Sequence, residues 1–170
     1  IYIAQKLADD YGDKYLIARI WDLMAEIYKD MGFYDSAFYA ITKSNKIFKE
    51  LKYYEEEANL LHKTGDLFYQ AGLYDKAEQY YREVQRVKGE PKAWKEWRKF
   101  VITNNLGLIY EKKGNYDKAF NYFSTALNNL IAERKFVFNY NDSVRLAYSY
   151  SSLANLFISK NDIEQAKFFI

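Results

Sequence analysis

The chain has 170 residues, with 18 Tyr, 12 Phe and 3 Trp, only one Pro, and no Cys. Disordered chains are poor in aromatic residues, and a chain without cysteine has no disulfide framework, thiolate zinc site or cysteine nucleophile. The formal net charge of +2 argues against nucleic acid or an anionic membrane as the main partner, and no apolar run reaches the roughly 18 residues of a membrane span.

Apolar periodicity and turn residues predict a succession of helices. The clearest break between them is at Lys88–Pro91, because Gly89 can end one helix and Pro91 suits the first turn of the next. Near residue 140 we expect Asp142 or Ser143 to cap a helix. The predicted helices cover 1–11, 14–31, 34–51, 53–71, 74–88, 91–113, 116–137, 142–160 and 162–170.

An internal repeat runs through these helices. Four segments align without gaps, namely 24–37, 64–77, 106–119 and 153–166. In each, a small residue is followed three positions later by an aromatic one, then by a turn residue, and the segment closes on alanine. The small residues are Ala25, Gly65, Gly107 and Ala154; the aromatics are Tyr28, Phe68, Tyr110 and Phe157; the turn residues are Gly32, Gly72, Gly114 and Asn161; the alanines are Ala37, Ala77, Ala119 and Ala166.

This pattern predicts a helical hairpin. Residues three apart are neighbours on one helix face, and Gly or Asn can take the left-handed conformation that ends a helix. The acidic residue after each turn, Asp35 for example, suits the positive end of the next helix dipole. The closing alanine lets the two helices approach closely.

The offsets of these residues resemble the tetratricopeptide repeat, a helix-turn-helix unit of about 34 residues. The resemblance implies an all-α fold, a right-handed α-solenoid of antiparallel helix pairs, with repeats at about 18–51, 58–88, 100–137 and 147–170. The turn residues at 32, 72, 114 and 161 are 40, 42 and 47 apart, so these repeats are longer than usual. Long repeats of this type resemble sensory segments of bacterial histidine kinases and transcription regulators.

Both ends of the sequence are expected to be cut from a longer array. Residues 4–18 align with 44–58 at an offset of 40, so 1–11 is expected to be the end of a preceding repeat. Terminal repeats normally need polar caps, and exposed terminal helices therefore suggest self-association.

Catalytic chemistry is not predicted. The single histidine, His62, has Asp66 one turn later, but no second His or Cys completes a metal site. Gly-rich phosphate loops are absent, and nothing selects a pair of carboxylates. No cofactor and no metal is expected.

The resemblance also implies a binding groove, because the first helix of each repeat lines a concave face in this family. The groove positions are Arg19, Asp22, Glu26, Asn59, His62, Lys63, Asp66, Val101, Asn104, Asn105, Leu108, Tyr148, Ser151 and Asn155. Asp22 and Glu26 replace the Lys and Asn of the clamp by which some members bind a carboxylate, and their charges would repel one. Groove asparagines in peptide-binding members pair with the ligand backbone, since an amide both donates and accepts.

The basic segment around Trp94 and Trp97 is the most unusual stretch. The two tryptophans continue toward Val101 at helical spacing and run into the predicted groove. One interpretation makes them an aromatic anchor for a protein partner, because Trp is enriched at binding hot spots. The alternatives are packing against the preceding repeat and stacking on nucleic acid.

Together these features predict a non-catalytic scaffold that binds a protein or peptide segment. By resemblance it is the sensory or interaction part of a larger bacterial signalling protein, with no nucleic acid as partner and no insertion into a membrane. Two alternatives stay open: a structural or oligomerising spacer, and a segment of a peptide-pheromone regulator. The sequence does not determine the compartment.

Overall fold

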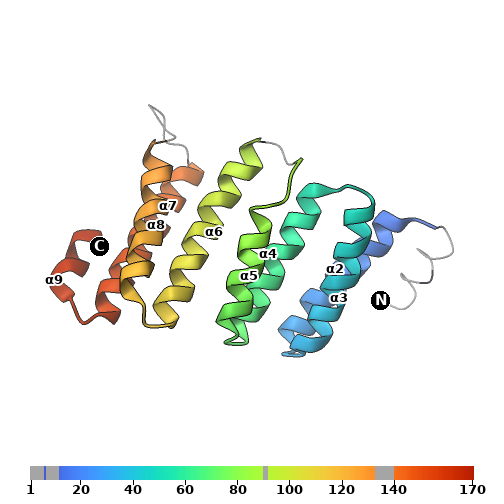
Figure 1. Cartoon of the computed structure of the whole chain (residues 1–170), viewed down its shortest axis with the longest axis horizontal. Coiled ribbons are helices and arrows are strands. Elements are labelled where there is room, and N and C mark those ends of the chain that lie inside the picture. The colour runs from blue at the N-terminus through green and yellow to red at the C-terminus, as the bar shows by residue number, and fades with distance from the viewer. Residues whose placement is uncertain (1–5, 7–11, 90–91, 133–139) are drawn as a thin grey trace. The chain divides into compact units, whose positions relative to one another are not determined.

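The structure is a computed structural model, and it describes residues 6, 12–89, 92–132 and 140–170, without the side chains of 92–97, 132, 140–143 and 145. The chain forms two compact units, Ile1–Trp94 (unit 1) and Lys95–Ile170 (unit 2). Every regular element among the described residues is helical (Figure 1), which agrees with the predicted all-α class.

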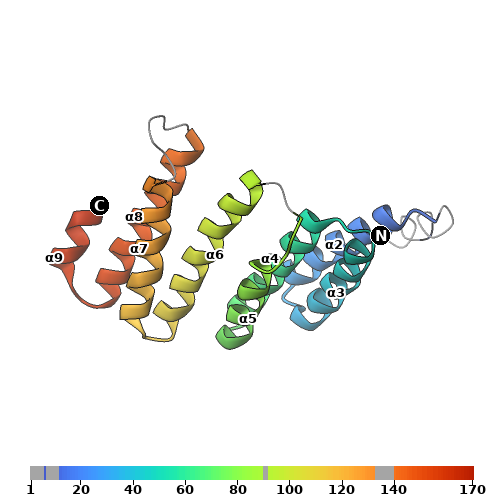
Figure 2. The same cartoon turned by 45° about the horizontal axis from the view of Figure 1, so that its top comes forward.

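Unit 1 consists of helical hairpins. Helix α2 (Lys14–Asp30) pairs with α3 (Tyr34–Glu50), α4 (Tyr54–Gln70) pairs with α5 (Tyr74–Val84), and α3 also packs against α4. The pairing is visible in both Figure 1 and Figure 2. Small residues at the centre of the hairpin interfaces allow this close packing. The core cluster contains Ala18, Ala25, Ala37, Ala40, Ile41, Phe48, Leu60 and Leu67.

The hairpin turns close as the repeat pattern predicts. In the first turn the amide of Phe33 donates to the carbonyl of Tyr28 at 2.8 Å, and the same bond recurs after the other predicted turn residues. Such a bond requires a residue in the left-handed region, where glycine is favoured. The turn residues and their φ angles are Gly32 (78°), Gly72 (74°), Gly114 (71°), Asn161 (60°) and, between α3 and α4, Lys52 (61°).

The small residue of the repeat makes room for an aromatic ring from the second helix. A Cβ atom on Gly65 would lie 2.4 Å from Cε1 of Tyr81, and one on Gly107 would lie 2.4 Å from Cε1 of Phe123. Tyr81 and Phe123 are both buried, four residues after their closing alanines. Glycine at these two sites is therefore explained by close approach and not by backbone conformation.

Unit 2 repeats the arrangement. Helix α7 packs against α8, and α8 packs against α9 and the short 3₁₀ turn η1. The elements of this unit are α6 (Lys92–Lys112, whose first three residues belong to unit 1), α7 (Tyr116–Ala132), α8 (Tyr140–Ser159), α9 (Ile163–Ala166) and η1 (Lys167–Phe169). Among the described residues, its core includes a buried cluster around Phe123, Leu153 and Leu156 and another around Phe100 and Leu130.

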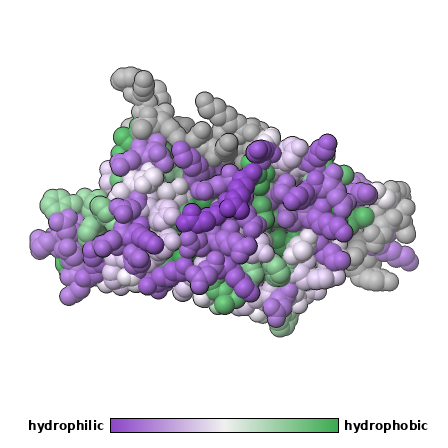
Figure 3. Space-filling model, viewed as in Figure 1, coloured by the Kyte–Doolittle hydropathy of each residue, from purple (hydrophilic) through white to green (hydrophobic). Residues whose placement is uncertain are grey.

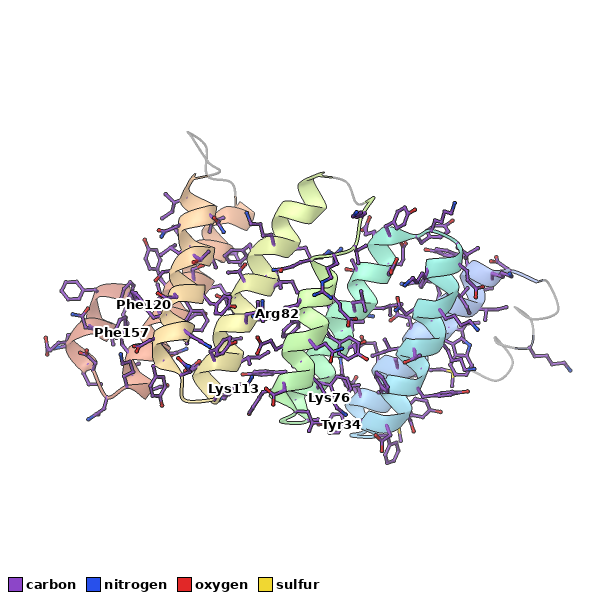
Figure 4. All side chains as sticks on the ribbon, in the orientation of Figure 1. Tyr34, Lys76, Arg82, Lys113, Phe120 and Phe157 are labelled. Carbon is purple, nitrogen blue, oxygen red and sulfur yellow. The ribbon has the colours of Figure 1, made fainter. Side chains whose placement is uncertain are left out.

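Stacked aromatic pairs explain more of the high aromatic content. In three of the four repeats, the aromatic near the end of the first helix stacks on a ring twelve residues later, a partner that the sequence pattern did not reveal; the first repeat has Ala40 at that position. The pairs are Phe68–Tyr80 (5.4 Å between centroids), Tyr110–Tyr122 (5.4 Å) and Phe157–Phe169 (5.6 Å). Phe120 of α7 also meets Phe157 of α8 edge-on at 5.8 Å (Figure 4).

Two predicted helix ends are wrong. The helix predicted over 74–88 ends at Val84, because the amides of Arg86 and Val87 bond to carbonyls three residues back. The helix predicted over 162–170 ends at Ala166 and tightens into η1. Apolar spacing continues past both points, so it gives no signal for the change in hydrogen bonding.

The predicted cap near residue 140 is also wrong. Helix α8 begins at Tyr140, which places Asp142 and Ser143 inside its first turn. The predicted helix over 1–11 lies outside the described residues apart from Lys6, and so does the end of the predicted helix 116–137.

The surface drawn in Figure 3 is mostly hydrophilic, and hydrophobic residues gather over the C-terminal end, where Phe168 and Ile170 are exposed. None of the described helices combines the length and the apolar character that crossing a membrane requires.

Candidate functional site

Five of the predicted groove side chains surround one pocket in unit 1. Its volume is about 150 Å³, and its lining residues are Arg19, Asp22, Phe48, Glu56, Asn59, Leu60, His62 and Lys63. The polar side chains come from α2 and α4, the first helices of consecutive hairpins, as the repeat register predicts. Phe48 and Leu60 are buried and supply the apolar part of the lining.

Ion pairs join the two helices beside this pocket. The Lys63 ammonium donates to Asp22 Oδ1 at 2.6 Å and lies 3.1 Å from Glu26 Oε1. Arg19 holds the other oxygen of Asp22 at 3.2 Å. Lys29 also bonds to Glu26. Because Asp22 and Glu26 are paired within the protein, they repel an approaching carboxylate less than their formal charges predicted.

The network shifts the pKa values of two of its members. Burial raises the pKa of Glu26, but the hydrogen bonds and charges of Lys29 and Lys63 outweigh it, so the net pKa is lower than the ordinary 4.5. The hydrogen bond to Glu26 is the main reason why the pKa of Lys29 is raised above 10.5. Both groups are therefore held in their charged forms at neutral pH.

His62 belongs to a second polar cluster at the same face. Its Nε2 atom lies 3.6 Å from Asp66 Oδ1, and the hydroxyl of Tyr81 donates to that same oxygen at 2.6 Å. The rings of His62 and Tyr81 lie 5.7 Å apart. The hydroxyl of Tyr81 reaches Asp66 from α5, a contact that no spacing rule indicates. Among the described residues, no group of three His, Asp or Glu side chains could hold a metal ion.

The asparagines predicted for the groove lie in different environments. Asn59 and Asn105 are partly buried and Asn155 is exposed, but Asn104 is 0% exposed. Both polar atoms of the Asn104 amide lack a hydrogen-bond partner among the described residues. In this conformation Asn104 is inaccessible to a ligand.

The remaining groove positions of unit 2 are divided in the same way. Val101 and Leu108 of α6 are partly buried and pack against the core clusters, so much of their side-chain surface is used in packing and is not open to a ligand. Tyr148 and Ser151 of α8 are exposed. Trp94 and Trp97 lie in α6, but their side chains are outside the described residues, and their proposed role as an anchor stays a prediction.

Comparisons with solved structures agree with this architecture. The chain resembles BtubC (BKLC) from P. vanneervenii, with a TM-score of 0.68 and 24% identity over 93% of this chain and 62% of that one. The apo quorum sensor NprR from B. thuringiensis gives a TM-score of 0.73 and 18% identity over 97% of this chain and 44% of that one. A Podosopora anserina protein of nearly identical TPR-like repeats gives a TM-score of 0.59 and 14% identity over 93% of this chain and 70% of that one. The chain thus spans less than two thirds of BtubC and of NprR.

At these identities the structural likeness shows the fold and not the function. No curated protein matches the sequence. Family profiles do match it: two profiles described as tetratricopeptide repeat cover residues 16–89 and 102–129, which include the turns at Gly32, Gly72 and Gly114. The chain therefore belongs to the tetratricopeptide repeat family.

Proposed function

We propose that this chain is a non-catalytic scaffold that binds a peptide segment of a protein partner, and that the pocket between α2 and α4 accepts one side chain of that segment. The observation that carries the proposal is the convergence of Arg19, Asp22, Asn59, His62 and Lys63 on one pocket from two different repeats. Family membership supports the general role, since solenoids of this kind present extended surfaces for binding.

The size of the pocket favours a peptide side chain over a cofactor. At about 150 Å³ it is smaller than the roughly 300–1,000 Å³ of pockets that bury a whole small molecule. Its lining combines the buried apolar surface of Phe48 and Leu60 with a polar rim. An amino-acid side chain with an apolar stem and a polar end has matching chemistry.

The polar rim favours a ligand that supplies hydrogen-bond acceptors. Both oxygens of Asp22 already accept bonds from Arg19 and Lys63, whereas a guanidinium has five N–H donors and Arg19 uses one in its ion pair. The side chain of Arg19 is also 46% exposed. Backbone carbonyls, or a side-chain amide or carboxylate, are the groups that such a rim would bind.

A random peptide library displayed on phage tests the proposal. The probes are the selected peptides themselves, titrated against the wild type and against Asn59→Ala and Lys63→Met. We expect at least tenfold weaker binding in both variants, with the Asn128→Ala variant, changed at an exposed site on α7, binding as the wild type does. Peptides that bind all four proteins equally would contradict a site between α2 and α4.

The finer role that we propose is that of a sensory or interaction segment in a larger bacterial signalling protein. The fold shared with the quorum sensor NprR supports this role and the alternative of a peptide-pheromone regulator. The gene sequence on either side of this segment distinguishes a signalling role from a structural spacer. An adjacent histidine kinase or DNA-binding domain supports a signalling role, whereas further repeats alone favour a structural spacer.

A further inference from the structure

The outward face of α2 carries an apolar stripe that nothing in the proposed function uses. Leu16, Leu23 and Ile27 of α2 and Met31 at its C-cap are between 44% and 59% exposed. Their spacing of seven, four and four residues places them on one side of the helix. The stripe runs the full length of α2, opposite the buried Ala18 and Ala25.

The other first helices carry buried or polar residues at equivalent positions. Ile27 is 44% exposed, but its equivalents Leu67, Ile109 and Leu156 are 1%, 0% and 0% exposed. The positions of Leu16 and Leu23 differ from their equivalents in residue type. The equivalents of Leu16 are Glu56, Arg98 and Arg145, and those of Leu23 are Lys63, Asn105 and Ser152. At Leu16 and Leu23, helix α2 is thus apolar where the other first helices are polar, so these two positions differ from an ordinary contact between repeats.

The charges beside the stripe indicate what covers it. Arg19 and Asp30 are eleven residues apart, close to three full turns, so they lie on the same flank of α2 and at opposite ends. Two such helices packed antiparallel bring the same flanks together and set Arg19 of each copy near Asp30 of the other. In a parallel two-fold pair these flanks would lie on opposite sides of the interface, so Arg19 of one copy would not meet Asp30 of the other. The side chain of Asp30 is 77% exposed, and its one ion pair within the described part of the chain is a 4.0 Å contact with Lys29.

We propose that the chain self-associates through this stripe, with α2 packed antiparallel against α2 of a second copy across a two-fold axis. The midpoint of Leu16 and Met31 is residue 23.5, so Leu23 lies nearest the axis and Leu16 faces Met31 of the second copy. An apolar stripe flanked by one cation and one anion is self-complementary in this arrangement, as a two-fold interface requires. Arg19 also lines the pocket between α2 and α4, but the apolar stripe itself contains no residue of that pocket.

The absence of cysteine from the sequence allows a direct test of the geometry. A disulfide needs Cβ atoms about 3.8 Å apart. A variant with a single cysteine therefore forms a covalent dimer only if that position lies next to the same position of the second copy. Oxidation of Leu23→Cys is expected to give a covalent dimer and that of Met31→Cys is not. A mixture of Leu16→Cys and Met31→Cys chains, carrying tags of different length, is expected to give the mixed dimer. A Met31→Cys homodimer formed as readily as that of Leu23→Cys would overturn the antiparallel arrangement.

Sedimentation equilibrium tests whether the uncrosslinked protein associates at all. We expect a wild-type dimer and at least a tenfold higher Kd for Leu23→Lys, which installs the residue that α4 has at this position. Leu73→Lys is the matched control, because Leu73 is similarly exposed but lies in the turn between α4 and α5. Circular dichroism confirms that each variant is folded. A monomeric wild type, or equal dimerisation of the two variants, would overturn the proposal.

Discussion

Adding one methyl group at Gly65 tests the hairpin packing most directly. In an ordinary helix Gly→Ala stabilises by about 1 kcal/mol, because alanine loses less backbone entropy. At Gly65 the new Cβ would lie 2.4 Å from Cε1 of Tyr81, well inside contact distance. The ring cannot swing aside cheaply, since Tyr81 is buried and its hydroxyl bonds to Asp66 at 2.6 Å. Overpacking of this kind costs about 1–3 kcal/mol, so we expect Gly65→Ala to lower the free energy of unfolding by about 1 kcal/mol.

The first hairpin supplies the compensating pair. It has Ala25 and Ile41 at the positions of Gly65 and Tyr81, and both are buried in the core of unit 1. With Tyr81→Ile in the background, the methyl group of Gly65→Ala no longer meets a ring and should stabilise by its usual amount. The coupling between the two changes is then about 2 kcal/mol, the difference between a loss and a gain of about 1 kcal/mol each.

Urea unfolding of the four proteins of this double-mutant cycle, followed by circular dichroism, measures the coupling. Loss of the hydroxyl of Tyr81 affects the single and the double variant alike and so cancels. The same cycle at Gly107 and Phe123 is an independent repeat of the test in unit 2. Additive effects, or a Gly65→Ala variant more stable than the wild type, would refute the steric explanation.

Three further changes probe other features. Lys52 has a φ of 61°, so Lys52→Gly should raise stability by about 0.5–1 kcal/mol in thermal melts, whereas Lys46→Gly inside α3 should lower it. Because the pKa of Glu26 is lowered in the folded state, its carboxylate stabilises the fold above pH 4.5, and this stabilisation is lost as the pH falls through the folded pKa. The difference in free energy of unfolding between the wild type and Glu26→Gln should therefore shrink in urea titrations at decreasing pH. A difference that stays constant would contradict this explanation. The buried hydroxyl of Ser149 has no partner among the described residues, so Ser149→Ala should unfold at an equal or higher urea concentration; a clear loss would reveal a bond that the structure lacks.

The repeat pattern was sufficient to predict the hairpins because its signals are local. A left-handed turn residue such as Gly72 and a buried closing alanine such as Ala77 act within a few positions of each other. The end of α5 at Val84 was not predictable in the same way, since it depends on bonds to carbonyls three residues back and not on apolar spacing.

The candidate site was predicted only in part for a related reason. The register located the residues of α2 and α4, but it treated Asp22 and Glu26 as unpaired charges. Their partner Lys63 is 41 residues from Asp22 in sequence, and only the packing of one repeat on the next brings them to 2.6 Å. The burial of Asn104 was likewise invisible, because groove positions are alike in sequence whether or not the neighbouring helix covers them.

The match between Gly65 and Tyr81 also restricts how such an array can evolve. A second helix carrying a large ring fits only a first helix with glycine opposite, whereas Ile41 is accommodated by Ala25. Recombination that moves a complete hairpin preserves both partners, but a crossover within the turn would pair alanine with the ring or leave glycine facing a void. Gene duplication and exchange in this family member should therefore be tolerated in steps of whole hairpins, with breakpoints in the segments between them.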